Sequence, residues 1–198
     1  ENAIQDLLQE SDYDDFFNEH FDRELEQLGP EFEKRTELVE QMRDQAKKIS
    51  PLIMPEVANH FGEFEVFSVE EKLFEKINDF SLDKYNFKGY IDLVIKTKDG
   101  KYHVIDWKTC SWGWDREKRN SKLITYQLTL YKKYDIDPKL VETHFALLKR
   151  TAKKDNVEIF RVTSGPKKTS NATDLLHKAL INIDRKLYIK NRLSCKGC

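Results

Sequence analysis

Apolar residues near the middle of the chain form two short runs, which together predict a β-hairpin. The runs cover residues 87–95 and 102–107, and a Thr-Lys-Asp-Gly sequence between them has the composition of a tight turn. Each run carries one aspartate, Asp92 in the first and Asp106 in the second. Asp106 and Lys108 are two residues apart, so they point to the same face of their strand. The hairpin can therefore bring two carboxylates and a lysine side by side.

Periodic patterns elsewhere predict helices before this hairpin, and two strands and further helices after it. We expect helices over 3–10, 13–27, 31–49, 54–61, 122–134 and 171–190, strands over 64–74, 143–149 and 157–163, and a basic loop over 164–170. Pro51 and Pro55 are expected to separate the third helix from the fourth. A chain of 198 residues favours one domain. Within it we distinguish a helical part (1–62), a sheet core (63–163) and a C-terminal helix with its tail (171–198).

The paired carboxylates have a clear chemical implication. Two carboxylates held close together repel each other unless a cation lies between them, and an aspartate inside an apolar strand is costly unless it is paired or bound to metal. Mg²⁺ and similar cations take oxygen ligands, often carboxylates together with substrate phosphate and water. A neighbouring lysine can orient or deprotonate a water, or stabilise charge on the phosphate. The pattern therefore predicts metal-assisted phosphodiester hydrolysis, with an ordinary solvated hairpin as the alternative.

Three motifs in sequence order resemble those of a known enzyme family. Gly89-x-x-Asp92, Asp106-Trp-Lys-Thr109 and Gln127-x-x-x-Tyr131 are similar to motifs of the PD-(D/E)XK nuclease superfamily, and in particular of its RecB-like branch. That branch includes the nuclease domains of RecB and AddB and the CRISPR-adaptation and mitochondrial genome-maintenance exonucleases. The resemblance, clearest over residues 63–148, implies an α/β fold with a restriction-endonuclease-like core. That core is a central mixed sheet of about five strands flanked by helices.

The resemblance also implies an activity and its residues. It implies a single nuclease domain over 1–198 that is a Mg²⁺- or Mn²⁺-dependent deoxyribonuclease, more an exonuclease than an endonuclease. Its substrate would be single-stranded DNA or DNA ends in recombination, repair or replication, and helicase or recombination proteins would be its partners. Asp92 and Asp106 would hold the metal, Lys108 would act on the attacking water or the transition state, and Glu70 would add a ligand or position water, with Glu71 as the next choice. A non-cleaving DNA-binding subunit and a restriction-type endonuclease remain alternatives.

Further residues are candidates for substrate contact. By the same resemblance, Gln127 and Tyr131 would share a helix face and hold the nucleic acid near the site. The polar segment after the second strand reads as a loop, in which Trp112, Trp114 and Arg116 could stack on unpaired bases and contact phosphates. The alternative is that the two tryptophans pack on the core.

Two features of RecB-like nucleases are only partly matched. Their early helix often carries a metal-binding histidine, for which Gln5 and His60 are the candidates in this chain. Cys195-x-x-Cys198 resembles the start of the segment that binds an iron–sulfur cluster in some members. A [4Fe–4S] cluster needs four ligands and this chain has three cysteines, so a cluster is expected only if the parent chain supplies more. A zinc site or free thiols are the alternatives.

Charge and composition add less. The net charge is −1, but residues 1–33 hold twelve acidic residues against one basic residue, and residues 150–198 hold twelve basic against four acidic. This asymmetry is compatible with a basic DNA-facing surface on the C-terminal half, or with solvated helix faces of no function.

The few cysteines favour a reducing intracellular compartment, cytoplasm or nucleoid, in a cellular, phage-encoded or organellar protein. No apolar run predicts a membrane span and no secretory signal is visible. The first residue is Glu1, so processing of the N-terminus stays open.

Overall fold

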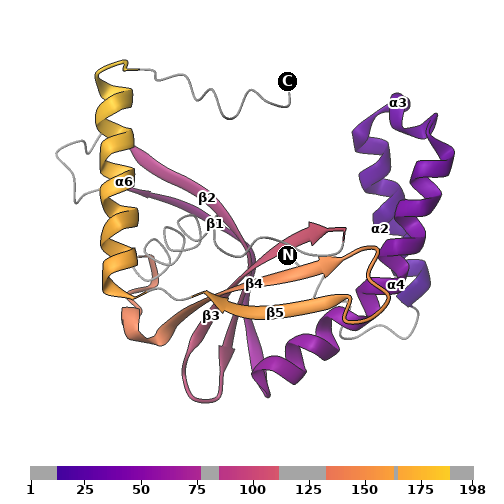
Figure 1. Cartoon of the computed structure of the whole chain (residues 1–198), viewed down its shortest axis with the longest axis horizontal. Helices are drawn as coiled ribbons and strands as arrows, with labels where there is room; N and C mark the ends of the chain where they lie inside the picture. The colour runs from indigo at the N-terminus through magenta and orange to yellow at the C-terminus, as the bar shows by residue number, and fades with distance from the viewer. Residues whose placement is uncertain (1–12, 77–84, 112–132, 163–164, 188–198) are drawn as a thin grey trace.

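A mixed β-sheet forms the centre of the protein (Figure 1). The computed structural model describes residues 13–76, 85–111, 133–162 and 165–187. In this part of the chain five strands pair in the order β1-β2-β3-β4-β5, and all neighbours are antiparallel except β3 and β4. The bounds are Phe64–Lys76 (β1), Asn86–Thr97 (β2), Tyr102–Cys110 (β3), Val141–Lys149 (β4) and Val157–Val162 (β5). The predicted α/β fold with about five strands in a mixed sheet is confirmed.

Strands β2 and β3 form the predicted hairpin. Its turn is closed by hydrogen bonds from Thr97 N to Lys101 O (3.0 Å) and from Gly100 N to Thr97 O (2.9 Å). Gly100 has a φ of +82°, a conformation that a residue without a Cβ adopts at little cost. The Asp-Gly pair therefore forms the predicted tight turn. This turn fixes the register that brings the two arms of the hairpin together.

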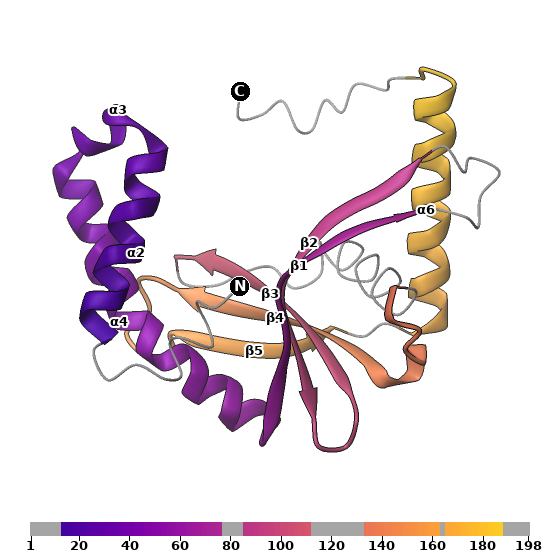
Figure 2. The same ribbon diagram turned by 180° about the vertical axis from the view of Figure 1, so that it is seen from behind.

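The β1–β2 ribbon leaves the rest of the sheet partway along its length. β1 pairs with β2 from Phe64 to Lys76, whereas β2 pairs with β3 only between the Lys96–Tyr102 and Leu93–Ile105 pairs. Beyond that point the ribbon runs away from β3 and toward α6 (Pro166–Asp184) in both views (Figures 1 and 2). The strands diverge at the level of Asp92, one residue beyond the last β2–β3 pair.

Each face of the sheet has its own hydrophobic cluster. One cluster lies under α4 (Thr36–Phe61) and consists of Val57, Leu93, Ile95, Ile105 and Ala146. The other lies on the opposite face and consists of Leu73, Ile91, Val94, Val104, Val141, Phe145 and Val162. Alternation along β3 puts Asp106 and Lys108 on the same face as Val104, away from α4, and puts His103 on the α4 face.

The N-terminal helices differ from the prediction in their bounds. α2 (Tyr13–Leu28) is close to the expected helix, but a short α3 (Pro30–Glu33) is separate from α4. The expected break between residues 49 and 54 is wrong, since α4 runs through Pro51 and Pro55 without interruption. The two prolines are one turn apart and both are exposed, so the carbonyl groups that lose their hydrogen bonds face water. Burial of Ile49 and Val57 under the sheet holds the helix together on either side.

Helix α6 begins earlier and ends earlier than predicted. Residues 166–170, expected to be a loop, are helical, because Pro166 stands at the first helical position, where its missing N–H costs nothing. The helix ends at Asp184 rather than at residue 190. Leu180 on this helix is buried, whereas Leu175, Ile183 and Leu187 are at least half exposed.

Some predicted segments lie outside the described residues. These are the helix over 3–10 and most of the helix over 122–134, of which Lys133 and Tyr134 are described and helical. Among the described helices, none combines the length and the hydropathy that crossing a membrane requires.

Candidate active site

Asp92 connects the two arms of the hairpin where their backbone pairing ends. Its Oδ2 accepts a hydrogen bond from the backbone N–H of Trp107, at 2.7 Å. The side chain thus replaces a strand–strand hydrogen bond that the divergence of β2 from β3 has removed. Continued by one residue, the β2–β3 register would set Asp92 opposite Asp106. The bond therefore holds the carboxylate of Asp92 at the middle of the Asp106-Trp107-Lys108 motif.

Asp106 and Lys108 form an ion pair on the face of β3 away from α4. The Lys108 ammonium contacts Asp106 Oδ2 and donates a hydrogen bond to Trp107 O (3.1 Å). Its Nζ also lies 6.0 Å from the centre of the Phe145 ring. Asp106 is buried, and its Oδ2 has no well-aligned hydrogen bond from the described residues. A buried carboxylate oxygen with only an ion pair is suited to a second cation.

Glu70 lies at the level of Asp92 on the neighbouring strand. The flanking pairs of β1 and β2 are Val69–Leu93 and Glu71–Ile91, so residues 70 and 92 face each other between them. Burial raises the pKa of Glu70, and the negative charge of Asp92 raises it further. The two carboxyl groups are therefore close enough to repel each other. A cation between them would relieve the repulsion.

The backbone of Glu70 has an unusual conformation for a strand residue. Its φ is +50°, in the left-handed region that residues with a Cβ rarely adopt. Val69 packs in the cluster under α4 while Leu73 packs in the opposite cluster, although strict alternation would put both on one face. On β2 the paired residues Leu93 and Ile91 divide between the two clusters in the same way, so both strands of the ribbon change faces at the level of Glu70 and Asp92. The pairing stays in register across Glu70, and a strained backbone next to a set of charged side chains is typical of functional sites.

Glu71 anchors Lys133 and Tyr134, which follow the Gln-x-x-x-Tyr motif in the sequence. Its Oε1 accepts hydrogen bonds from Lys133 Nζ (2.5 Å) and Tyr134 Oη (2.7 Å), and Lys133 Nζ also donates to Lys72 O (2.9 Å). The Tyr134 ring packs edge-on against Phe67, with centroids 5.0 Å apart. Burial alone would raise the pKa of Glu71, but the hydrogen bonds from Lys133 and Tyr134 outweigh it and lower the pKa. Lys133 and Tyr134 are therefore fixed to β1, one residue from Glu70.

The structure places the other predicted site residues less closely or not at all. Gln5, Trp112, Trp114, Arg116, Gln127, Tyr131, Cys195 and Cys198 lie outside the described residues, so their roles stay predictions. His60 is described and lies at the end of α4, with its ring centre 5.8 Å from that of His144. That position is on the α4 face of the sheet, whereas Asp106 is on the other face.

Two features were not predicted from the sequence. Glu71 was named only as the next choice after Glu70, and its hydrogen bonds with Lys133 and Tyr134 were not foreseen. The other comprises His103, Glu142 and His144 on the α4 face, whose ligand atoms lie within 4.8 Å of one another. Glu142-x-His144 could have been noticed as two polar residues sharing one face of an apolar strand. Their meeting with His103 depends on the parallel pairing of β3 and β4, for which the chain carries no local signal.

The carboxyl groups of Glu70, Asp92 and Asp106 come from three adjacent strands and offer a metal ion only oxygen atoms as ligands. The pKa of Glu70 is raised by burial and by repulsion from Asp92. The buried Oδ2 of Asp106 is ion-paired with Lys108 but has no well-aligned hydrogen bond from the described residues. Both features fit a hard divalent cation. The ammonium of Lys108 next to them can act on a phosphate or a water molecule. The arrangement is therefore able to support phosphodiester hydrolysis.

Comparison with solved structures gives distant similarities. A Eubacterium rectale protein described as a "Putative exonuclease" has 10% sequence identity and a TM-score of 0.49, covering 79% of this chain and 58% of that one. The protein SSO0001 has 18% identity and a TM-score of 0.41, covering 75% of this chain and 68% of its own. This chain thus spans 58% of the length of the Eubacterium rectale protein. No curated protein sequence matches it.

Comparison with protein families gives a match over nearly the whole chain. The model of the PD-(D/E)XK nuclease superfamily matches residues 2–198. The order of the three motifs is consistent with the RecB-like branch. The match includes the hairpin with Asp92, Asp106 and Lys108, the residues that the sequence singled out. The chain belongs to the PD-(D/E)XK nuclease superfamily.

Proposed function

We propose that this protein is a divalent-metal-dependent deoxyribonuclease with its active site at Glu70, Asp92, Asp106 and Lys108. The observation that carries the proposal is the hydrogen bond from Trp107 N to Asp92 Oδ2. It fixes one carboxylate against the strand that supplies the other carboxylate and the lysine. Family membership supports the reaction class and DNA as the substrate.

Each residue has a distinct role in this proposal. Asp92 and Asp106 bind Mg²⁺ or Mn²⁺, and Glu70 adds a ligand or positions a water molecule. When bound, the cation would polarise the scissile phosphate and lower the pKa of a water molecule. Lys108, held by Asp106 and Trp107 O, orients the attacking water or stabilises the charge that develops on the phosphate. Water adds to phosphorus as the ester P–O bond breaks, and a proton passes to the leaving oxygen.

We further propose that the substrate is single-stranded DNA or a DNA end and that the enzyme is an exonuclease. Gln127 and Tyr131 would hold the substrate, and Glu71 anchors Lys133 and Tyr134, which follow them in the sequence. Trp112, Trp114 and Arg116 come directly after β3 in the sequence, and they would stack on unpaired bases and contact phosphates. Action in recombination, repair or replication, beside helicase or recombination proteins, would suit such an activity.

The test is digestion of end-labelled linear single-stranded DNA, linear duplex DNA and a closed circle. Each substrate is incubated with Mg²⁺, Mn²⁺ or EDTA. Asp106→Ala and Lys108→Ala are assayed beside the wild type, with Lys154→Ala, an exposed lysine on the β4–β5 turn, as the matched control. We expect metal-dependent loss of linear DNA by the wild type and the control, none by the two site variants, and an intact circle.

The outcomes separate the parts of the proposal. Cutting of the circle would replace the exonuclease assignment with an endonuclease while keeping the site. Full activity of Asp106→Ala or Lys108→Ala would show that the active site is not at the assigned residues. Absence of cleavage with every metal, together with retained and salt-sensitive DNA binding, would make the protein a DNA-binding subunit instead.

A further inference from the structure

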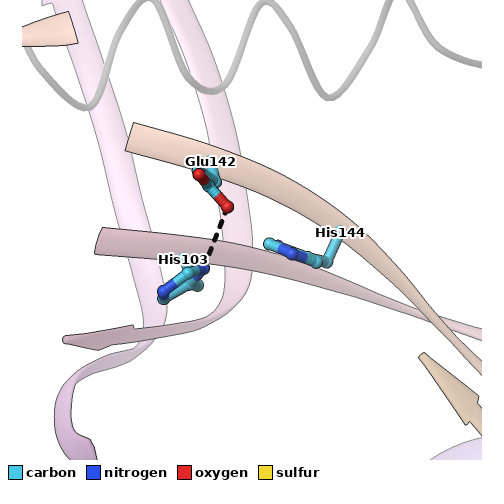
Figure 3. Close-up of side chains that lie close together, drawn as sticks. All are labelled: His103, Glu142 and His144. Atoms are coloured by element: carbon cyan, nitrogen blue, oxygen red, sulfur yellow. Dashed lines mark ion pairs between the residues drawn. The ribbon is translucent and has the colours of Figure 1, made fainter. Parts of the chain in front are cut away.

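A group of buried polar side chains lies on the α4 face of the sheet, apart from the nuclease carboxylates. His103 on β3 and Glu142 on β4 are paired in register, and His144 follows two residues along β4 on the same face (Figure 3). Both histidines are buried, and Glu142 is largely so. His103 and Asp106 are three residues apart on one strand, about 10 Å, and face opposite sides. The group is therefore a separate feature of the molecule.

The hydrogen bonds around Thr97 assign the proton on His103. The Thr97 hydroxyl donates to Asp99 Oδ1 at 2.5 Å, so toward His103 Nε2, at 3.1 Å, its oxygen acts as the acceptor. Nε2 therefore carries the ring proton, and Nδ1 is left with a lone pair. Burial lowers the pKa of His103 despite the nearby charge of Glu142, so the ring is neutral at neutral pH. Neutral imidazole with one nitrogen fixed by a hydrogen bond is the form that binds metals.

The lone pair of His103 Nδ1 faces another acceptor. Glu142 Oε2 lies 3.8 Å away, and Nδ1 has no hydrogen-bond partner in the described part of the chain. Arg161 (3.2 Å) and Lys101 (3.4 Å) contact the other carboxylate oxygen, Oε1. Two acceptors that face each other inside a protein are unfavourable without a cation between them.

His144 completes the group. Figure 3 shows its ring pointing toward His103 and Glu142. Its Nδ1 is buried with no hydrogen-bond partner among the described residues, and its ring centre lies 5.1 Å from that of His103. Burial first, and then the neighbouring His103, His60 and Arg161, lower the pKa of His144 to about 3. His144 is therefore a second neutral imidazole that can bind a metal ion.

We propose that His103, Glu142 and His144 form a binding site for a transition-metal ion of the Zn²⁺ type, separate from the nuclease metal. Two imidazoles and a carboxylate are a common zinc ligand set, with a fourth position for water. Ligand atoms around tetrahedral zinc are roughly 3.4 Å apart, and the 3.8 Å between Nδ1 and Oε2 is already near that. The cavity beside the group, about 550 Å³, is lined by Phe61, Thr97, His103, Glu142, His144 and Arg161 among others, and it leaves room for that water.

The ligand types separate this site from the nuclease site. Imidazole nitrogen suits Zn²⁺, Co²⁺ and Ni²⁺, whereas a set of carboxylates suits Mg²⁺ and Mn²⁺. A bound ion would join β3 to β4 next to the end of α4, because Phe61 packs on both histidine rings (4.7 and 4.9 Å). Zn²⁺ should therefore stabilise the fold without supporting cleavage itself.

The test is titration of the metal-stripped full chain with Zn²⁺ by calorimetry and with Co²⁺ by visible absorption. Cys195→Ser/Cys198→Ser is the parent protein, so that the C-terminal cysteine pair cannot bind the metal. In this parent, His144→Gln and Glu142→Gln remove ligands, Thr97→Val removes the support of His103, and His177→Gln on α6 is the histidine control. Asp92→Asn/Asp106→Asn removes the two carboxylates proposed to bind the nuclease metal. Far-ultraviolet circular dichroism checks that each variant folds.

We expect one equivalent of Zn²⁺ to bind to the parent and raise its Tm, and Co²⁺ to give a tetrahedral-type visible band. His144→Gln and Glu142→Gln should weaken Zn²⁺ binding by about 100-fold or more, and Thr97→Val by about 10-fold, since loss of outer-shell support alone has effects of that order. His177→Gln and Asp92→Asn/Asp106→Asn should bind like the parent.

The proposal is overturned if the parent binds no Zn²⁺, or if Asp92→Asn/Asp106→Asn abolishes binding while Glu142→Gln keeps it. If His144→Gln does not fold, Glu142→Gln and the cobalt spectrum of the parent decide the question. An inactive nuclease that still binds Zn²⁺ in this pattern would leave the proposal standing, so its failure is distinguishable from failure of the proposed function.

Discussion

Asp92 on β2 is joined to Trp107 on β3 through a hydrogen bond from the Trp107 backbone N–H to the Asp92 carboxylate, at 2.7 Å. The bond lies where the β1–β2 ribbon separates from the sheet, one residue past the last β2–β3 pair. One aspartate thus closes the opened strand edge and takes part in the proposed metal site. Its structural and chemical roles can be separated by substitution.

Asp92→Asn and Asp92→Ala should differ in stability and agree in activity. The asparagine oxygen still accepts the hydrogen bond from Trp107 N, whereas alanine leaves that N–H unpaired at a cost of about 1–3 kcal/mol. Both variants lack the carboxylate and should lose cleavage. Urea denaturation in EDTA measures the first effect, and a DNA-cleavage assay the second. Equal stability of the two variants would mean that the hydrogen bond contributes nothing to the fold.

Glu70→Gln should be more stable than the wild type at neutral pH and less active. A raised carboxyl pKa means that the folded state favours the protonated form, so ionised Glu70 destabilises the fold above its raised pKa. Glutamine has no charge, and its advantage should shrink as the pH falls below the ordinary pKa, where Glu70 is protonated in both states. Denaturation curves from pH 4 to pH 8 in EDTA test this expectation. A Glu70→Gln protein that is less stable at pH 7 would contradict it.

Glu71→Gln should destabilise the protein and reduce cleavage although Glu71 itself need not touch the metal. The substitution weakens the charged hydrogen bonds from Lys133 and Tyr134, for a loss of about 2 kcal/mol. Since the pKa of Glu71 is lowered, its contribution is present above the ordinary pKa and is lost as the pH falls through the folded-state value. Glu65→Gln on the same strand, an exposed residue paired with Lys96, is the control. Equal losses of stability and cleavage in Glu71→Gln and Glu65→Gln would show that Glu71 does not act as an anchor.

Acid should destabilise the metal-free protein through the histidines on the α4 face. The lowered pKa of His144, about 3, means that the unfolded chain takes up its proton first, so stability falls as the pH drops from about 6.5 toward 3. The titratable and charged groups near it are His103, His60, Glu142 and Arg161, with Lys101 beside Glu142. His144→Gln should flatten this dependence and His177→Gln should not. The measurement is the Tm of each variant across that pH range in EDTA. The same pH dependence of the Tm in His144→Gln and His177→Gln would contradict this expectation.

The part of the site that lies on β2 and β3 was predictable because its information is local. An Asp-Gly turn fixes the register. Two aspartates within apolar strands are noticeable in the sequence, because burying an unpaired carboxylate is energetically costly. The left-handed φ of Glu70 was not predictable, since nothing in a Val-Glu-Glu sequence indicates a strained backbone. That Glu70 lies opposite Asp92 while Glu71 holds Lys133 and Tyr134 also required the structure.

Long-range packing decided what the sequence could not. Pro51 and Pro55 are strong local signals for a helix break, but burial of Ile49 and Val57 carries α4 through them. The meeting of His103 with Glu142 and His144 depends on the pairing of β3 with β4, which are separated by thirty residues in the sequence. Local patterns describe each strand and leave the partner of a parallel strand open.

The central claim is that a metal held by the carboxylates of the hairpin cleaves DNA. The most direct measurement is the initial rate of cleavage of end-labelled single-stranded DNA in Mg²⁺ by the wild type, Asp106→Asn and Asp155→Asn. Asp155 lies in the β4–β5 turn with a φ of +52°, which asparagine tolerates, so its variant controls for the same chemical change. The account predicts a rate reduced about 1000-fold in Asp106→Asn and unchanged in Asp155→Asn. Equal rates for Asp106→Asn and the wild type would contradict it.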